Sequence, residues 1–361
     1  MSPTPEGASV AVDAFCGAGG LSLGLTNAGF DVRYAFDNDA WAITTYVKNL
    51  GDHAECVDAL GLTGSAVLDK AGVTELDLLA GGPPCQGFSK QKRGAHFGDK
   101  RNALVIEYLR LVEEIKPKAF LLENVPMMAQ IRGAHLVDRF HSLDEYELTG
   151  HHYVAANYGV AQTRQRFMLV GIRKDQRGSF VVPPPVSPVW PTVGDVIGDL
   201  PEPPANYAEH PDFPNHQAAR VTVANIERFS FVPQGGGWQD IPFDRRLPCH
   251  QVVDVTKGGW PDVYGRLKWD GQCPTITGGF DSFTRGRYGH PLRDRPLTPR
   301  EAARLQGFPD TFAFEGTRYD VRHQIGNAVP VPLAAAVGGS ILAALDGRSV
   351  KREPDQPTLF D

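Results

Sequence analysis

A cysteine in a glycine- and proline-rich segment is the strongest chemical signal in the chain. Residues 81–89 read GGPPCQGFS with Cys85 at the centre, and they follow residues 76–80, an apolar run typical of a buried strand. Cys85 would then lie at the carboxyl edge of a sheet, where α/β enzymes hold their chemistry. The cations that follow it favour the thiolate, namely Lys90, Lys92 and Arg93. We therefore predict a nucleophilic cysteine; a buried, unreactive cysteine is the alternative, and it fits a Gly/Pro loop poorly.

Ionisable side chains also accompany the next two predicted strands. Glu123 ends the apolar run 119–123, and a half-buried carboxyl group at a strand end is easily protonated, which suits a proton donor. Arg164 and Arg166 alternate at the start of a further apolar strand, and alternate residues of an extended segment face the same side. We expect the two guanidinium groups to bind phosphate or carbonyl oxygens.

A glycine cluster separates a predicted strand, residues 9–15, from a predicted helix that ends near Ala28; it comprises Gly17, Gly19 and Gly20. The N-terminus of a helix attracts electron-rich ligand groups, and glycine allows the backbone to approach them closely. Ser22 occupies the position where the dinucleotide motif G-x-G-x-x-G requires its last glycine. The cluster therefore favours a nucleotide-like cofactor that lacks a pyrophosphate.

Two aspartates, Asp37 and Asp58, follow the second and third predicted strands. In a doubly wound sheet these strand ends line the cofactor crevice, where an acid can hold ribose hydroxyls or an adenine amine. Ordinary turn acids are the alternative interpretation of both residues.

The same glycine cluster also matches the nucleophile elbow of ester hydrolases, G-x-S-x-G, through Gly20, Ser22 and Gly24. An elbow requires its serine directly at the turn from strand to helix. Ser22 instead follows the predicted strand by seven residues and falls inside the predicted helix. The hydrolase alternative is therefore disfavoured.

Short β-rich runs alternate with helix-length amphipathic segments through the first half of the chain. The predicted strands are residues 9–15, 31–36, a third that precedes Asp58, and residues 76–80, 119–123 and 166–172. The predicted helices between them include residues 40–49 and 101–115. Strands that alternate with helices imply right-handed crossovers, so we predict an α/β fold with a doubly wound, mostly parallel sheet that is covered on both faces.

Composition places the chain among globular proteins with a substantial core. Its 361 residues are 42% hydrophobic and 22% charged, which suits two to three domains. Five widely spaced cysteines without a C-x-x-C pair favour a reducing cytoplasm over a disulfide framework or a zinc site. No apolar run approaches the roughly 18 residues of a membrane span. We predict a cytoplasmic protein with neither a membrane nor a metal partner.

The second half of the chain differs in texture from the first. Residues 183–248 hold nearly half of the 29 prolines and predict a separate, loop-rich domain with short strands. Regular helices return after Thr298, where Pro299 and Glu301 fit a capping box, and again over residues 332–345.

The net charge is −6, yet two stretches are locally basic. Residues 86–101 include Lys90, Lys92, Arg93, Lys100 and Arg101. Residues 281–304 include Arg285, Arg287, Arg293, Arg295, Arg300 and Arg304. Such stretches can bind a polyanion even in an acidic protein, and a solvated basic face is the alternative.

Taken together and in this order, these segments resemble the motifs of the DNA (cytosine-5) methyltransferases of bacterial restriction-modification type. The similar segments are residues 13–20, 83–86, 123–125, 162–166, 295–309 and 324–330. The resemblance implies the fold of methyltransferases that use S-adenosylmethionine. It also implies transfer of a methyl group to C5 of a flipped-out cytosine in a specific duplex sequence, through a covalent bond between Cys85 and C6.

The resemblance assigns roles by position. Cofactor contacts fall to Phe15, Gly17, Gly19, Gly20, Asp37, Asp58 and Asn327, with aspartate at position 37 where the family usually has glutamate. Catalytic contacts fall to Cys85 as nucleophile, Glu123 at cytosine N3, and Arg164 and Arg166 at cytosine O2 and the backbone. DNA contacts fall to Ser89, Lys90, Lys92, Arg93, Arg285 and Arg287.

The resemblance also implies an organisation and a set of partners. We expect a catalytic and cofactor-binding domain in residues 1–173, completed by 319–346, a loop- and strand-rich target-recognition domain in 174–318, and a disordered tail in 347–361. Double-stranded DNA is the expected partner of a monomer located at the bacterial nucleoid. Gln356 to Phe360 resemble the short peptides that dock on bacterial sliding clamps, although chance explains so short a match better.

Two related alternatives stay open from the sequence. An RNA cytosine-5 methyltransferase would use the same chemistry, although about 120 residues separate the flanking motifs here and those relatives are shorter in this region. A non-enzymatic DNA-binding relative would be expected to lack the nucleophile, which is present as Cys85. The sequence does not reveal the DNA target.

Overall fold

The computed structural model describes residues 7–84, 103–130, 134–253 and 262–348, and they form two compact units. Unit 1 comprises Met1–Tyr158, Gln165–Val186 and Val329–Asp361; unit 2 comprises Gly159–Arg164 and Ser187–Ala328. The expected boundaries, after residues 173 and 318, differ from these. The segment Gly159–Arg164 joins unit 2 because its side chains hydrogen-bond there, as described below for Arg164.

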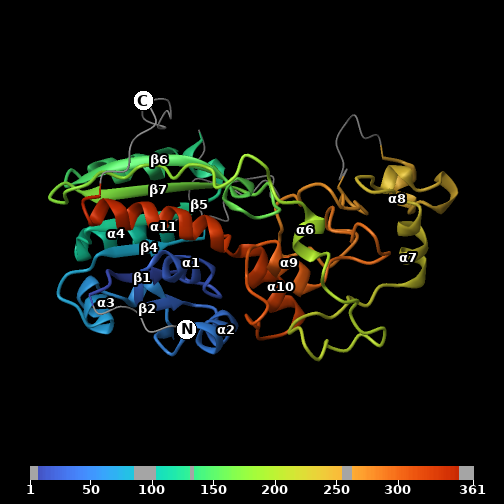
Figure 1. The fold of residues 1–361 in the computed structure, drawn as a ribbon, viewed down its shortest axis with the longest axis horizontal. Coiled ribbons are helices and arrows are strands. Elements are labelled where there is room, and N and C mark those ends of the chain that lie inside the picture. Colours follow the sequence, from blue (N-terminus) through green and yellow to red (C-terminus); the bar gives the residue numbers. More distant parts are fainter. Residues whose placement is uncertain (1–6, 85–102, 131–133, 254–261, 349–361) are drawn as a thin grey trace. The chain divides into compact units, whose positions relative to one another are not determined.

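A seven-stranded sheet forms the centre of unit 1, in the order β3-β2-β1-β4-β5-β7-β6 (Figure 1). Its strands are β1 (Val10–Ala14), β2 (Asp31–Asp37), β3 (Ala54–Cys56), β4 (Leu78–Gly81), β5 (Ala119–Asn124), β6 (Tyr146–Val154) and β7 (Gln165–Arg173). The first five strands of that order run parallel, and β7 is antiparallel to both β5 and β6. The predicted doubly wound, mostly parallel sheet is confirmed, and β6 is a strand that the sequence did not predict.

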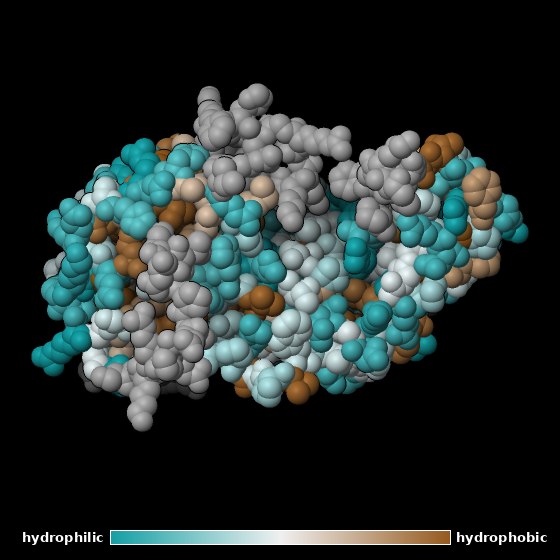
Figure 2. All heavy atoms as spheres, turned by 90° about the horizontal axis from the view of Figure 1, so that it is seen from above, coloured by the Kyte–Doolittle hydropathy of each residue, from teal (hydrophilic) through white to brown (hydrophobic). Residues whose placement is uncertain are grey.

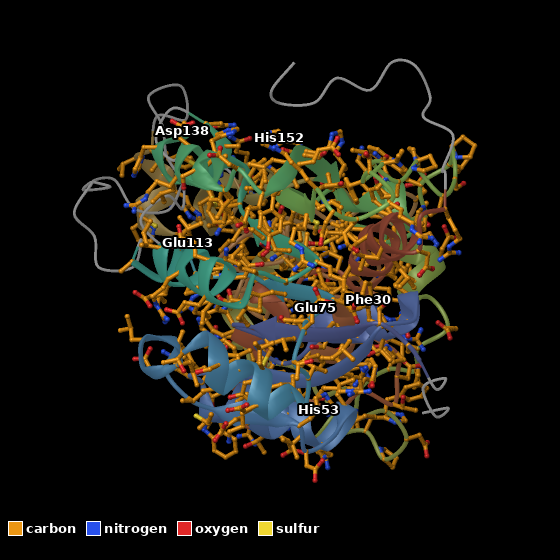
Figure 3. All side chains as sticks on the ribbon, turned by 90° about the vertical axis from the view of Figure 1, so that its left-hand side faces the viewer. Phe30, His53, Glu75, Glu113, Asp138 and His152 are labelled. Carbon is orange, nitrogen blue, oxygen red and sulfur yellow. The ribbon has the colours of Figure 1, made fainter. Side chains whose placement is uncertain are left out.

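Helices cover both faces of this sheet, as a doubly wound fold requires. On one face lie α3 (Gly64–Ala71), α4 (Ala103–Ile115) and α5 (Ala134–Asp138), whose apolar residues join one core cluster. On the other lie α1 (Gly20–Ala28), α2 (Ala40–Leu50) and α11 (Val331–Leu345). Figure 3 shows Phe30 in this second layer, where its side chain is fully buried.

Two glycines allow α1 and α11 to pack closely. A Cβ atom on Gly24 would overlap the Cβ of Ala334 and lie 2.7 Å from the carbonyl oxygen of Val331. A Cβ on Gly338 would lie 3.0 Å from a methyl group of Leu25. Gly24 is therefore a packing residue between two core helices, which explains its presence without an elbow for a nucleophile.

One stretch, Arg318–Leu345, is long and apolar enough to cross a membrane by length and composition alone. In the structure it consists of two helices, α10 (Arg318–Asn327) and α11, with Pro330 between them. Residues of α11 are buried in the core of unit 1 beside α1. The apolar character of this stretch is thus explained by its place in a protein core.

Unit 2 consists of short helices joined by irregular segments. Its helices are α6 (Val193–Ile197), α7 (Val223–Ser230), α8 (Pro248–Gln251), α9 (Pro299–Arg304) and α10. The strands expected here are not formed in the described part of the unit, which has only isolated bridges such as Arg266 with Gly289. Proline cannot donate a backbone hydrogen bond to a sheet ladder, so the proline-rich composition suits loops instead.

The predicted start of α9 is confirmed. The side chain of Thr298 accepts a hydrogen bond from the backbone of Glu301, the Glu301 carboxylate accepts one from the backbone of Thr298, and Pro299 opens the helix.

Aromatic side chains form a small core in unit 2, with Phe229, Trp238, Tyr264 and Phe283 as its largest members. Figure 2 shows a face on which hydrophilic side chains predominate and apolar ones are dispersed.

Candidate active site

The backbone that leads to Cys85 is fixed to the end of a neighbouring strand. β4 ends at Gly81, and Asn124, the last residue of β5, donates a hydrogen bond of 2.9 Å from Nδ2 to the carbonyl oxygen of Pro83. This contact holds the approach to Cys85 at the carboxyl edge of the sheet. Residue 85 itself lies outside the described residues, together with the other positions predicted in this loop: Ser89, Lys90, Lys92 and Arg93.

Glu123 lies beside this approach and forms an ion pair with Arg166. Glu123 is the last residue but one of β5 and is more deeply buried than expected, with the residue only 8% exposed. Nε of Arg166 lies 2.5 Å from Oε1 of Glu123, because Glu123 is paired with Met168 in the sheet and Arg166 lies two residues before Met168, on the same face of β7. A second guanidinium nitrogen, Nη1 of Arg166, donates to the carbonyl oxygen of Gln165.

Burial controls the protonation of this pair. Loss of water around the Glu123 carboxyl raises its pKa, and the charge of Arg166 offsets only part of that effect. Burial likewise lowers the pKa of Arg166, which remains a cation at neutral pH. A buried carboxyl group with a raised pKa can hold a proton that it later delivers.

Gly82 shows how closely the acid and the predicted nucleophile segment approach one another. A Cβ atom on Gly82 would lie 3.0 Å from Oε2 of Glu123. Glycine at this position therefore leaves room for the carboxylate directly against the backbone, three residues before Cys85. The structure thus brings Glu123, Arg166 and the approach to Cys85 together at one edge of the sheet.

Arg164 is held by backbone carbonyls of unit 2. The residue is 1% exposed, and Nη1 donates to the carbonyl oxygen of Ile276 at 2.8 Å and Nη2 to that of Gly326 at 3.0 Å. Its Nε is buried and has no acceptor within the described residues, so the guanidinium group keeps unused N–H donors. The contact with cytosine O2 or the backbone that the resemblance assigned to Arg164 stays a prediction.

The predicted cofactor residues of unit 1 lie at the carboxyl ends of β1, β2 and β3. Gly17 has a φ of 52°, and a Cβ atom there would meet nothing within 4 Å, so open space adjoins this backbone. Asp37 ends β2, and its carboxylate accepts the backbone N–H of Gly17 at 2.9 Å and that of Asp39 at 2.9 Å. Burial raises the pKa of Asp37. Asp37 thus holds the glycine turn in place, and Phe15 beside it adopts a φ of 59°.

Asp58 has one carboxylate oxygen in use and one free. The residue is exposed, and its Oδ1 accepts the backbone N–H of Leu60 at 3.1 Å, capping a short helical turn. Within the part of the chain that the structure describes, no partner binds its Oδ2.

Asn327 is the exposed last residue of α10 in unit 2. Gly19, with a φ of 97°, precedes α1, and Gly20 is the buried first residue of that helix.

Asp13, a buried acid of this region, belongs to the motif at residues 13–20, but no role was assigned to it from the sequence. Asp13, on β1, is fully buried; its Oδ2 accepts a hydrogen bond from Ser22 Oγ at 2.6 Å, and burial raises its pKa to about 7. Tyr46 in turn donates to Ser22 at 2.9 Å. Ser22 therefore lies inside α1, 1% exposed and engaged on both sides, which rules it out as the nucleophile of an ester hydrolase. The signal for Asp13 was its position on the first predicted strand, four residues before Gly17.

The second basic stretch presents fewer free charges than its composition suggested. Arg295 binds Glu301 through two hydrogen bonds, Arg300 is fully buried and donates to three backbone carbonyls, and Arg304 pairs with Asp310. The two residues predicted to contact DNA are exposed. Arg287 pairs with Asp262, and Arg285 has no bonded partner among the residues that the structure covers.

Comparison with known proteins identifies the family. The family model for C-5 cytosine-specific DNA methylases matches residues 10–343. The Type II methyltransferase M.PspPI of Psychrobacter sp. is 34% identical over 96% of this chain and 82% of its own length. The Type II methyltransferase M1.HphI of Haemophilus parahaemolyticus is 36% identical over 92% of this chain and 86% of its own length.

Solved structures agree with this family. A prophage-encoded protein of E. coli, assigned as a DNA modification methyltransferase, is 28% identical with a TM-score of 0.71 over 94% of this chain and 100% of its own. The S. pombe Dnmt2 methyltransferase shares the fold, with a TM-score of 0.58 at 18% identity over 93% of this chain and 98% of its own. The chain therefore belongs to the C-5 cytosine-specific DNA methylases and is a DNA (cytosine-5-)-methyltransferase.

Proposed function

We propose that this enzyme methylates C5 of a flipped-out cytosine within a specific duplex DNA sequence, as the modification enzyme of a restriction-modification system. The observation that carries the proposal is the shared position of Glu123, Arg166 and the approach to Cys85 at one sheet edge. The names of the Type II relatives support the restriction-modification context. The family match favours DNA over the RNA substrate that the sequence left open.

Each catalytic residue has a distinct task in this proposal. The Cys85 thiolate forms a bond to cytosine C6, and the protonated Glu123 carboxyl donates to N3, so that the ring becomes an enamine with a nucleophilic C5. Arg166 keeps the carboxyl group in place through its Nε, and its Nη2, which has no partner in the described residues, can donate to cytosine O2. C5 would take the methyl group that S-adenosylmethionine supplies when bound. Loss of the C5 proton to water, release of the thiolate from C6 and return of the N3 proton to Glu123 then restore aromaticity.

A base within a duplex cannot be reached by these groups, because its ring faces are covered by stacking. Extrusion of the target nucleotide costs a few kcal/mol, which contacts with the flipped base and the remaining duplex must offset. Gly82 supports the close approach of the flipped base to Glu123. Because Gly82 has no side chain, nothing at this position covers the Glu123 carboxyl group.

The cofactor residues fit S-adenosylmethionine, which supplies an electrophilic methyl group on sulfur. The open space at Gly17 suits the methionine part, while Phe15, Asp37 and Asp58 are placed at strand ends that bind nucleosides in doubly wound folds. Gly19, Gly20 and Asn327 complete the proposed set. We add Asp13 to this proposed set, because its buried Oδ1 has no partner among the described residues.

The remaining features of the proposal concern organisation and partners. Unit 2 is the proposed target-recognition domain, and a monomer acts on DNA at the nucleoid in the cytoplasm. The tail segment from Gln356 to Phe360, which lies outside the described residues, is proposed as a docking peptide for a sliding clamp.

The function is tested by sequencing genomic DNA from a bacterial host that has no cytosine-5 methylation of its own and expresses this chain. We expect 5-methylcytosine at one recurring sequence context. The same host expressing Cys85→Ser should lack it. Methylation confined to RNA, or on a nitrogen atom of a base, would contradict the proposal.

Asp58 allows a sharp test of the cofactor site. Asp58→Asn should keep the cap on Leu60, because asparagine caps as well as aspartate, but it replaces a carboxylate oxygen that could accept from the adenine amine. We expect the affinity for S-adenosylmethionine, measured by calorimetry, to fall by roughly 1–3 kcal/mol. Asp69→Asn is the control, at an exposed position near the C-terminal end of α3, and this variant should bind S-adenosylmethionine normally. Equal affinity in both variants would remove Asp58 from the site.

A further inference from the structure

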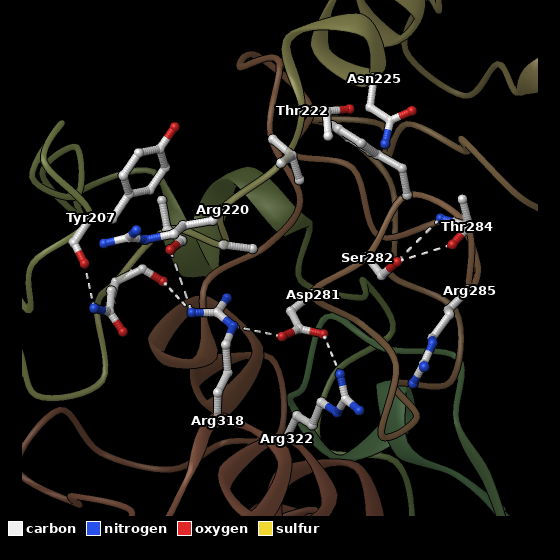
Figure 4. A pocket seen from close by; sticks show the side chains of 15 residues that line it. Tyr207, Arg220, Thr222, Asn225, Asp281, Ser282, Thr284, Arg285, Arg318 and Arg322 are labelled. Atoms are coloured by element: carbon white, nitrogen blue, oxygen red, sulfur yellow. Dashed lines mark hydrogen bonds and ion pairs between the residues drawn. The ribbon is translucent and has the colours of Figure 1, made fainter.

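Unit 2 contains a cleft that four arginines help to line. Its volume is about 540 Å³, and three parts of the unit line it: residues 207–225, residues 281–285 and helix α10 (Figure 4). Arg220 and Arg285 come from the first two parts, and Arg318 and Arg322 come from α10. Among these, only Arg285 belongs to a stretch that the sequence marked as basic.

The floor of the cleft is an ion cluster that carries excess positive charge. Asp281, with a side chain 5% exposed, accepts from Arg318 Nε at 2.7 Å and from Arg322 Nη1 at 3.4 Å. One carboxylate thus meets two guanidinium groups. Nη2 of Arg318 and Nε of Arg322 are buried and have no acceptor within the described residues. The cluster is therefore rich in donors and short of acceptors, which is the property of an anion site.

The rim adds two cations that nothing in the described residues neutralises. The guanidinium groups of Arg220 and Arg285 are exposed and form neither an ion pair nor a hydrogen bond there. Arg220 lies over the ring of Tyr207, 5.5 Å from its centroid, which orients the group without consuming its N–H donors. Figure 4 shows Arg220 and Arg285 on opposite sides of Asp281.

We propose that this cleft binds the sugar–phosphate backbone of the duplex substrate through Arg220 and Arg285, with Asp281 as the residue that positions Arg318 and Arg322 beneath it. A cluster that only stabilised the fold would need Asp281 with Arg318 and Arg322. It would not need the two unpaired arginines at the rim. A backbone with regularly spaced charges can reach cations on both sides of Asp281, and the hydroxyl groups of the lining can donate to the same oxygens. The proposal rests on the proposed function in that duplex DNA is the substrate.

The test uses the full chain and a duplex of about 30 base pairs with no known target, since phosphate contacts do not depend on sequence. The variants are Arg220→Gln, Arg285→Gln and the double substitution. The control is Arg177→Gln, an exposed arginine of unit 1 that removes the same charge. Arg177 follows β7, which ends beside the start of β5, so it lies at the opposite edge of the sheet from Glu123.

Dissociation constants are measured between 50 and 200 mM salt, and the slope of log affinity against log salt is compared. Each single variant should bind about tenfold more weakly at low salt and lose about 0.9 from the slope; the double variant should lose about 1.8. Arg177→Gln should match the unsubstituted chain. Thermal melting should be unchanged in all four variants, because none of these side chains has a bonded partner in the described structure.

The outcomes separate the two proposals. If the unsubstituted chain fails to bind the duplex, the proposed function itself is contradicted. If it binds with a steep salt dependence and the cleft variants keep the same slope, the cleft is not a phosphate site. An equal loss of slope in Arg177→Gln also overturns the cleft, because the effect would then follow net charge alone.

Discussion

Replacement of Cys85 by serine is expected to abolish methyl transfer and covalent trapping on duplex DNA that carries 5-fluorocytosine at the target position. A serine hydroxyl without an adjacent base is a far weaker nucleophile than a thiolate, so the loss in rate should be on the order of 10⁴-fold or more. Fluorine at C5 cannot depart as a cation, so with Cys85 in place the adduct persists after methyl transfer. The adduct is measured as a species that survives denaturing electrophoresis.

Peptide mapping and a control variant test whether this result is specific to Cys85. Peptide mapping should place the bond on Cys85, and the exposed Cys249 provides a matched control, since Cys249→Ser should trap DNA normally. The duplex carries the sequence context that genomic sequencing reveals. A stable adduct on Ser22, or on any cysteine other than Cys85, would overturn the catalytic assignment.

Glu123→Gln should slow methyl transfer by roughly 10² to 10⁴-fold while DNA affinity is retained. Glutamine keeps the shape of the side chain but holds no acidic proton, so the donor at N3 is lost. Because burial raises the pKa of Glu123, its protonated form extends to higher pH than that of an exposed glutamate. The rate of the unsubstituted enzyme should therefore fall as pH rises through this pKa, and the variant should lack that limb.

Single-turnover rates across pH and equilibrium DNA binding measure the two effects separately. Glu113→Gln, at an exposed position on α4, is the control and should leave both unchanged. An unaltered rate in Glu123→Gln would exclude it as the proton donor. A parallel loss of DNA affinity would indicate that the Glu123–Arg166 pair mainly supports the structure.

The parts of the fold that were predictable are those with strong local periodicity. Buried parallel strands are continuous apolar runs, and so the strands from β1 to β5 that carry the site were recognised, although no bounds were predicted for the short β3 before Asp58. β6 escaped prediction because it is an edge strand of mixed polarity, with Gly150, His151 and His152 at its centre. Apolar periodicity does not mark such a strand.

The candidate site was predictable where chemistry coincided with a strand end, as for Glu123. The shared face predicted for Arg164 and Arg166 shows the limit of that reasoning. Alternate residues share a face only within one extended strand, and β7 begins at Gln165, so Arg164 falls before it and turns into unit 2. Pairing is also invisible to a count of charges, and for this reason Arg295 and Arg300 were counted as a basic patch although they are committed to Glu301 and to backbone carbonyls.

The close packing of α1 against α11 has a consequence for biosynthesis. The two helices are separated by about 300 residues, and at the usual 5–20 residues per second the ribosome needs roughly 15–60 s between them. Until α11 emerges, the apolar face of α1, with Leu21 and Leu25, has no helix to cover it. The core of unit 1 is thus completed only after most of unit 2 has been synthesised, so a chain interrupted before α11 lacks the helix that covers α1.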